Sequence, residues 1–169
     1  MTEEQISWFT IEKILAFTKE QIQALTEKQI LAFTKEQIQA LTEKQIPTFT
    51  KEQIPALTKE QIPWFTKEQV SSFLPSQIAV FTTEQIQAFT WWQIPWFTEQ
   101  QIASFTKEQI VSFTEQQISY FAPLWSKILF KKYINDEKSW KEINVKNRIN
   151  DEKSWEEINV KNRSISKFI

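Results

Sequence analysis

Apolar and polar residues alternate through the first 121 residues in a pattern that repeats every eight positions. Counting from Thr2, fifteen octads of the form T-x-x-Q-I-x-x-F run to Phe121 without an insertion or deletion. The fifth position is Ile in every octad except at Val70, and the eighth is always Phe or Leu. A match of this length indicates a repeat array.

The polar positions of each octad predict the start of a helix. The first position is Thr in fourteen octads, with Leu74 as the exception, and the fourth is Gln in all but one, where Lys13 stands. T-x-x-Q is the capping-box pattern, so Thr18 is expected to accept a hydrogen bond from the Gln21 backbone while the Gln21 side chain reaches back. Glu at the second or third position suits the positive end of a helix dipole.

One continuous helix does not fit this pattern. Eight residues advance a helix by about 800°, which is 80° past two turns, so the Ile and Phe positions would drift around its surface. Proline at the sixth position (Pro47, Pro55, Pro63 and Pro95) would also interrupt it repeatedly. We therefore expect an all-α solenoid of short one- to two-turn helices whose stacked octads share one core. A β-solenoid is the alternative, but Lys, Glu, Gln and Ala are poor strand residues.

The ends of these helices follow from the same positions. Proline at the sixth position is expected to end its helix after about one turn, whereas Pro75 stands where proline suits the first helical residue. The chain has no Gly, so the usual left-handed glycine cap is missing. We expect the eighth residue and the next Thr to make the bend in extended geometry. Small residues common at the seventh position, such as Ala24 and Ala56, would let adjacent turns approach closely.

The period breaks after the array, and two further segments follow. Residues 122–133, APLWSKILFKKY, place apolar residues at helical spacing and predict a helix that caps the open end of the solenoid. A basic amphipathic helix lying on a membrane surface is the alternative. Residues 134–169 contain INDEKSWKEINVKNR at 134–148 and INDEKSWEEINVKNR at 149–163, which we expect to be helical, and a short tail.

Composition argues against catalysis and against metal binding. The chain has no Cys, so there is neither a disulfide framework nor a thiolate metal site, and it has no His, the commonest general base and metal ligand. Nothing resembles a glycine-rich phosphate loop. We expect a non-enzymatic protein without a metal or a cofactor.

The formal net charge of −1 is unevenly distributed along the chain. Residues 1–121 carry 9 basic and 14 acidic side chains, and residues 122–169 carry 11 and 7. An acidic array opposes phosphate binding, so no nucleic-acid partner is expected. The amino terminus, MTEEQISWF, lacks the basic and apolar regions of a signal peptide, and no apolar run approaches a membrane span. The cytoplasm is the default location, and secretion by a signal-independent route stays open.

Octads 2–121 also resemble a known kind of repeat. ALTEKQI at 40–46 and ALTKEQI at 56–62 are similar to the octapeptide A-L-T-x-x-Q-[IV]-x arrays of large bacterial surface or secreted proteins. The resemblance implies a structural or adhesive part rather than a catalyst.

Aromatic residues at variable positions give the best functional signal. Octad 90–97 reads TWWQIPWF where octad 58–65 reads TKEQIPWF, so its framework is intact and only positions expected to face outward differ. Exposed indoles in a cluster are typical of binding hot spots. The candidate partner-binding residues are Trp91, Trp92, Trp96 and Trp64.

Two functions fit this sequence. The first is a repeat scaffold that binds a protein partner through an exposed Trp-rich surface. The second is a self-assembling structural or surface element, which stacks through an amino-terminal octad without a distinct polar cap. The same tryptophans could also pack internally, on the carboxy-terminal helices or on another copy of the chain.

Overall fold

A computed structural model describes residues 6, 8–120, 128 and 132, and these residues form a succession of short helices. The α-helices are α2 (Ile11–Leu15), α3 (Lys19–Gln23), α4 (Glu27–Leu31), α5 (Lys35–Ala40), α6 (Lys67–Ser72), α7 (Pro75–Ile78), α8 (Thr83–Ala88), α9 (Glu99–Ser104), α10 (Lys107–Ser112) and α11 (Glu115–Ser119). The 3-10 helices are η1 (Ile46–Thr48), η2 (Ile54–Ala56), η3 (Ile62–Trp64) and η4 (Ile94–Trp96). The described part of the chain contains no strand, which confirms the all-α prediction there.

Complete capping boxes begin α3 to α6 and α8 to α11, as the T-x-x-Q pattern predicts, whereas α2, with Lys13 at the fourth position, has only the bond from the Lys13 N–H to the Thr10 hydroxyl. Before α6, the backbone N–H of Gln69 donates to the Thr66 hydroxyl at 3.4 Å, and the Thr66 N–H donates to Gln69 Oε1 at 2.9 Å. At the exceptional Leu74 only the second half of the box remains, with the Leu74 N–H donating to Gln77 Oε1 at 2.7 Å. Pro75 then occupies the first residue of α7, where its missing N–H costs no hydrogen bond.

Proline at the sixth position changes the type of helix. Pro63 has no N–H to donate to the carbonyl four residues earlier, so the last turn tightens, and the Trp64 N–H donates to the Gln61 carbonyl at 3.0 Å. The other octads with proline at this position behave in the same way. Proline therefore lies within a short 3-10 helix that ends one residue later; the helix is as short as the sequence predicts, but its 3-10 type was not predicted.

Extended residues make the bend between octads, as expected from the missing glycine. Phe73, which closes α6, has φ −60° and ψ 136°, and Leu74 has φ −69° and ψ 149°. Neither angle pair needs a positive φ, so a side chain is tolerated at both positions. The bend between helices is consequently built without a left-handed residue.

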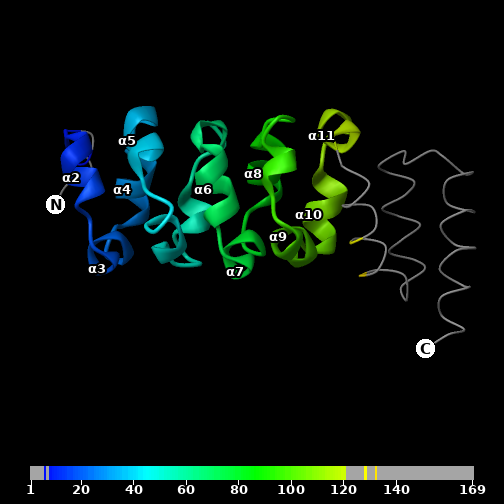
Figure 1. The fold of residues 1–169 in the computed structure, drawn as a ribbon, viewed down its shortest axis with the longest axis horizontal. Helices are drawn as coiled ribbons and strands as arrows, with labels where there is room; N and C mark the ends of the chain where they lie inside the picture. The colour runs from blue at the N-terminus through cyan, green and yellow to red at the C-terminus, as the bar shows by residue number, and fades with distance from the viewer. Residues whose placement is uncertain (1–5, 7, 121–127, 129–131, 133–169) are drawn as a thin grey trace, which may run out of the picture.

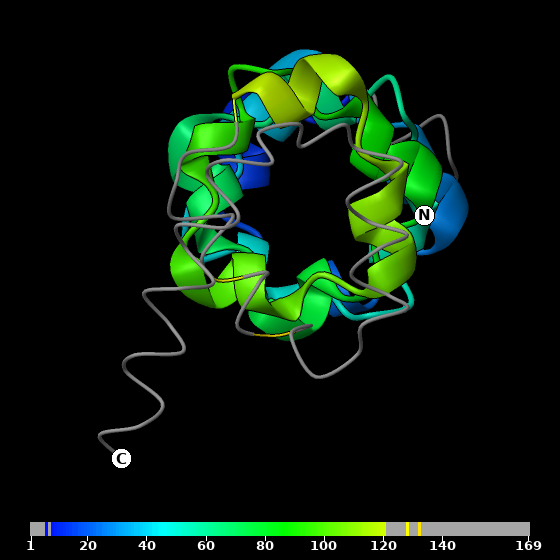
Figure 2. The same ribbon diagram turned by 90° about the vertical axis from the view of Figure 1, so that its right-hand side faces the viewer.

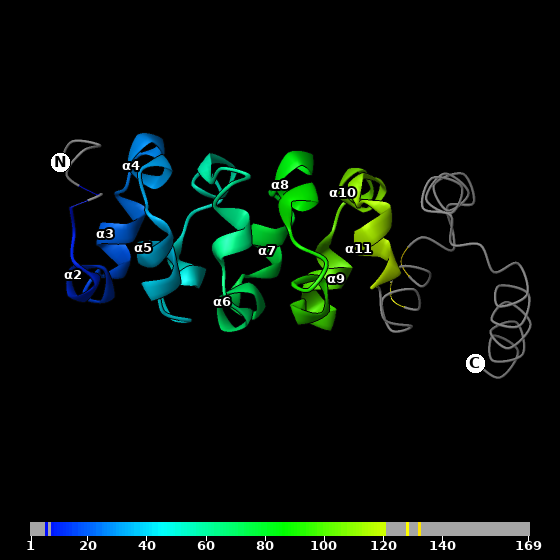
Figure 3. The same ribbon diagram turned by 90° about the horizontal axis from the view of Figure 1, so that it is seen from above.

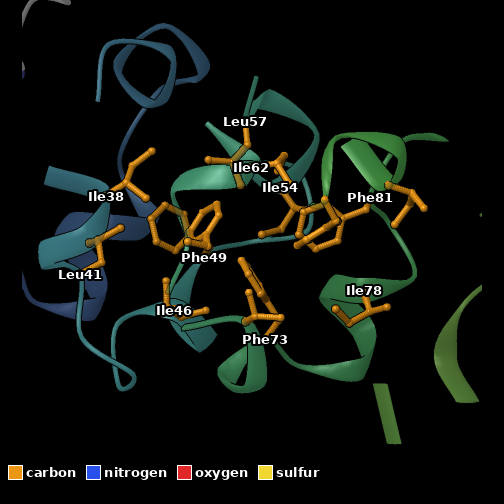
Figure 4. Close-up of a cluster of buried hydrophobic side chains, with 14 of the residues drawn as sticks. Ile38, Leu41, Ile46, Phe49, Ile54, Leu57, Ile62, Phe73, Ile78 and Phe81 are labelled. Atoms are coloured by element: carbon orange, nitrogen blue, oxygen red, sulfur yellow. The ribbon is translucent and has the colours of Figure 1, made fainter. Parts of the chain in front are cut away.

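Successive octads wind around a common axis, as Figures 1 and 3 show. Seen along this axis, the helices lie on every side of a ring (Figure 2). Helices three octads apart pack together, among them α2 against α5, α7 against α9 and α8 against α10. Figure 4 shows Ile and Phe or Leu anchors of the middle octads pointing into the space between the helices, and Ile54 and Ile62 are fully buried. A single hydrophobic core therefore runs along the axis.

Phenylalanines at the eighth position form a ladder inside this core. Neighbouring rings from Phe65 to Phe113 meet edge to face, with centroids 5.0–5.5 Å apart. Such pairs contribute about 0.5–1.5 kcal/mol each beyond the burial of their area. The ladder ties each octad to the next one along the chain.

The glutamine at the fourth position has a second role, which the sequence analysis missed. Gln61 is 1% exposed. Its Oε1 closes the capping box of its own octad, and its Nε2 donates to the carbonyl of Ile30 at 2.9 Å and of Phe33 at 3.2 Å. These acceptors lie 31 and 28 residues earlier, on the preceding turn of the coil. The glutamine amide therefore joins two turns.

The same pair of bonds recurs along the coil, and we call it the glutamine ladder. Its donors are Gln37, Gln45, Gln53, Gln61, Gln69, Gln77, Gln85, Gln93, Gln101, Gln109 and Gln117. Helices three octads apart pack together, while each glutamine reaches into the octad four before its own. One turn of the coil therefore takes between three and four octads.

The two ends of the ladder differ from its middle. Gln21 is exposed and bonds only within its own capping box, and Lys13 replaces glutamine in the octad before it. At the other end, Lys132 Nζ donates to the carbonyl oxygens of Ala103 at 2.7 Å and Phe105 at 2.6 Å, close to where a further glutamine amide would bond.

Ile128 also packs against the core. The cap predicted for residues 122–133 stays a prediction. The rest of that segment and the helices predicted for 134–169 lie outside the described residues.

Candidate partner-binding surface

Octad 90–97 is held in the coil by the same bonds as its neighbours. Gln93 is fully buried, and its Nε2 donates to the carbonyls of Ile62 at 3.2 Å and Phe65 at 3.0 Å. Ile94 and Phe97 are buried in the core. The octad therefore has a fixed position, and the residues that distinguish it are carried on a rigid frame.

The start of this octad differs in one detail from a complete capping box. The Thr90 N–H donates to Gln93 Oε1 at 2.9 Å, and the Thr90 hydroxyl donates to the same oxygen at 3.0 Å. The Gln93 N–H is satisfied by the Thr90 carbonyl at 2.9 Å. Trp91 and Trp92 follow Thr90 in this turn, before the 3-10 helix η4.

Trp91 stacks on an aromatic ring from the next turn of the coil. Its ring lies 4.4 Å from that of Tyr120, with an angle of 26° between the planes. The two residues are 29 positions apart, so the second position of one octad lies beside the seventh position of an octad on the following turn. Both remain exposed, Trp91 at 39% and Tyr120 at 43%. Stacking restrains the indole but leaves much of it open to solvent.

Trp92 meets Trp96 within its own octad. The two rings are 4.9 Å apart and nearly perpendicular, at 71°. Trp92 is 41% exposed, whereas Trp96 is only partly exposed and packs against the hydrophobic core. The expectation that all three tryptophans of this octad face outward therefore holds for Trp91 and Trp92, and Trp96 serves mainly as their support. We call Trp91, Trp92, Trp96 and Tyr120 the Trp cluster.

Trp64 stands apart from this cluster. It belongs to η3 on the preceding turn, is partly buried and also packs against the core. It makes no ring contact with another aromatic side chain among the described residues. The structure thus brings three of the four predicted residues together and adds Tyr120, which the 29-residue offset between turns could have identified.

A groove of about 420 Å³ lies beside the Trp cluster, between octads 90–97 and 114–121. We call it the aromatic groove, and it is lined by Gln87, Ala88, Phe89, Thr90, Trp91, Trp92, Thr114, Gln116 and Gln117. None of these side chains carries a charge. The Gln87 amide crosses from one turn to the next by donating to the Ser112 carbonyl at 3.1 Å.

A matched groove occurs six octads earlier in the coil. It measures about 540 Å³ and is lined by Leu41, Thr42, Glu43, Lys44, Thr66, Glu68 and Gln69. Each of its residues stands 48 positions before a residue of the aromatic groove, so the same backbone geometry is presented twice. Glu43, Lys44 and Glu68 are replaced by Trp91, Trp92 and Gln116, respectively. The coil therefore provides the groove, and the variable positions decide its chemistry.

Other kinds of site find little support in the described part of the chain. It contains no group of three or more His, Cys, Asp or Glu side chains arranged to hold a metal ion. No described helix is long and apolar enough to cross a membrane. Comparison with models of protein families, with curated proteins and with solved structures found no match.

Proposed function

We propose that residues 2–121 form a solenoid of fifteen octads that acts as a non-enzymatic scaffold and binds a protein partner through the Trp cluster. The observation that carries the proposal is the exposure of Trp91 and Trp92 at positions where other octads present charged side chains. Burying exposed aromatic area on a partner contributes strongly to binding, and aromatic residues are enriched in interface hot spots.

The rigidity of the frame also supports this function. Tyr120 and Trp96 hold the two exposed indoles in place, so little side-chain entropy is lost when a partner covers them. The neighbouring groove lets a protruding group of the partner pack beside the indoles. A surface of this kind favours a protein partner over a nucleic acid, because its lining offers no cation to phosphate.

Capture from a lysate of the source cells tests the proposal. The control is the double variant Trp91→Lys/Trp92→Glu, whose octad then reads TKEQIPWF, the sequence of octad 58–65. We expect the wild-type chain to retain a protein that this variant loses, at equal thermal stability. Capture of the same proteins by both chains would rule out the Trp cluster as the binding surface.

Self-assembly is the second candidate, and the amino-terminal turn favours it. Gln21 there is exposed and bonds only within its own octad, while Trp8 is 73% exposed and Leu15 is 50% exposed. A second copy packed on this end would cover both apolar side chains and extend the core. Sedimentation equilibrium decides the matter: a monomer at concentrations of hundreds of micromolar would exclude self-assembly.

A further inference from the structure

The aromatic groove presents hydrogen-bond donors that have no acceptor. No hydrogen bond joins the indole N–H of Trp91 or Trp92 to another described residue, and an indole N–H can only donate. Gln87 uses one amide hydrogen on the Ser112 carbonyl, which leaves the second one for a ligand. The groove therefore suits a ligand that is rich in acceptors.

The absence of charged side chains from the aromatic groove further restricts the kind of ligand that it can bind. In the matched groove of octads 42–49 and 66–73, both acidic and basic side chains stand at the lip. All three of those ionisable positions are neutral in the aromatic groove. A charged ligand would lose its hydration in this groove without meeting a side chain of opposite charge. A neutral apolar ligand would not incur this cost.

We propose that the aromatic groove binds an extended, uncharged proline-rich segment of the protein partner; this inference rests on the proposed function. A polyproline II segment has no internal hydrogen bonds, and its proline residues offer carbonyl acceptors without N–H donors. That matches the donor-only indoles of Trp91 and Trp92. Pyrrolidine rings pack well between aromatic faces, which is how aromatic-lined grooves recognise such segments.

The aromatic lining of the groove includes both exposed indoles, Trp91 and Trp92. Tyr120 stacks on Trp91 and Trp96 packs edge to face on Trp92, so both indoles are restrained by rings that lie outside the lining. The segment is rigid before it binds, so its ordering cost is small.

A fluorescein-labelled peptide of ten prolines provides the probe, and fluorescence anisotropy with the full chain provides the measurement. We expect saturable binding to the wild type and binding at least about tenfold weaker to Trp91→Lys/Trp92→Glu. The variant Trp8→Ala, which removes another exposed tryptophan far from the groove, should bind as the wild type does. A Gly-Ser peptide of equal length should not bind to any of the three chains.

Several results would overturn the inference: no binding of the proline peptide, equal binding by the double variant, or loss of binding in Trp8→Ala. Binding of cellohexaose in place of the peptide would assign the groove to a neutral saccharide. Dimerisation through the Trp cluster without peptide binding would assign it to a second copy. The proposed function fails separately, when the wild type and the double variant capture the same proteins from lysate.

Discussion

The glutamine ladder can be broken at one position by a nearly isosteric change. In Gln61→Glu the oxygen that closes the capping box is kept, but the Nε2 donor becomes an oxygen. This oxygen would face the carbonyls of Ile30 and Phe33, which now accept at 2.9 and 3.2 Å. The site is 1% exposed, so water cannot replace the lost donor.

The expected loss of stability follows from these contacts. Two hydrogen bonds disappear. The Ile30 carbonyl keeps the Phe33 N–H as a donor at 3.2 Å, whereas the Phe33 carbonyl loses its donor, and leaving a buried carbonyl unsatisfied costs about 1–3 kcal/mol. Together with the second lost hydrogen bond, we expect Gln61→Glu to lower the free energy of unfolding by about 3 kcal/mol at neutral pH. The buried carboxyl group should have a raised pKa, since burial and the two facing carbonyls disfavour its charge. Its protonated form can donate once, so the deficit relative to wild type should shrink as the pH falls and grow as it rises through this pKa.

Urea unfolding followed by circular dichroism measures this loss. The matched control is Gln21→Glu, where the capping box is present but the side chain is exposed and its amide nitrogen donates to no carbonyl of another octad among the described residues. We expect the control to change the free energy of unfolding by less than about 0.5 kcal/mol. Equal losses in the two variants would refute the assignment of a turn-joining role to the glutamine amide.

Three further outcomes test the packing of the coil. Gln39→Pro makes octad 34–41 identical to octad 50–57, so we expect its free energy of unfolding in urea to change by no more than about 1 kcal/mol. Ala56→Pro removes the N–H that donates to the Gln53 carbonyl, and we expect it to lower the free energy of unfolding by about 3 kcal/mol. Phe89→Ala opens the phenylalanine ladder and should lower the free energy of unfolding by about 3–5 kcal/mol; a loss below 1 kcal/mol would contradict the ladder. The backbone N–H of Glu52, and after it the Thr50 hydroxyl, hold the pKa of the Glu52 carboxyl below its ordinary value. The contribution of this carboxylate to stability is therefore present above its pKa in the unfolded chain and is lost as the pH falls through its pKa in the folded chain. Thermal unfolding should accordingly show a lower midpoint in acid, and a midpoint independent of pH would contradict this.

Local structure was predictable from the sequence because its causes lie within one octad. The capping box needs a Thr and a Gln three residues apart, and the extended bend needs no special residue. The type of helix at Pro63 was not foreseen, because a missing N–H can either end a helix or tighten it. The tighter turn is kept by the bond from the Trp64 N–H to the Gln61 carbonyl, which needs no N–H from Pro63.

Contacts between turns were not predictable, because they depend on the number of octads in a turn. The sequence did carry one signal for the ladder: a capping box accepts Glu as well as Gln, yet no octad has Glu at the fourth position. Only an amide can accept from its own octad and donate to the preceding turn. Lys13, the single exception, instead places its ammonium group over the Phe9 ring, 4.6 Å from the ring centroid. The stacking of Trp91 on Tyr120 likewise follows only once the 29-residue offset is known.

The most direct test of the account is a titration of the ¹⁵N-labelled chain with the partner captured from lysate, observed at the indole N–H signals of its eight tryptophans. Single Trp→Phe variants assign these signals. We expect the signals of Trp91 and Trp92 to shift or broaden on binding, while that of Trp8 stays in place. Shifts confined to Trp8, with Trp91 and Trp92 unchanged, would contradict the claim that the Trp cluster is the binding surface.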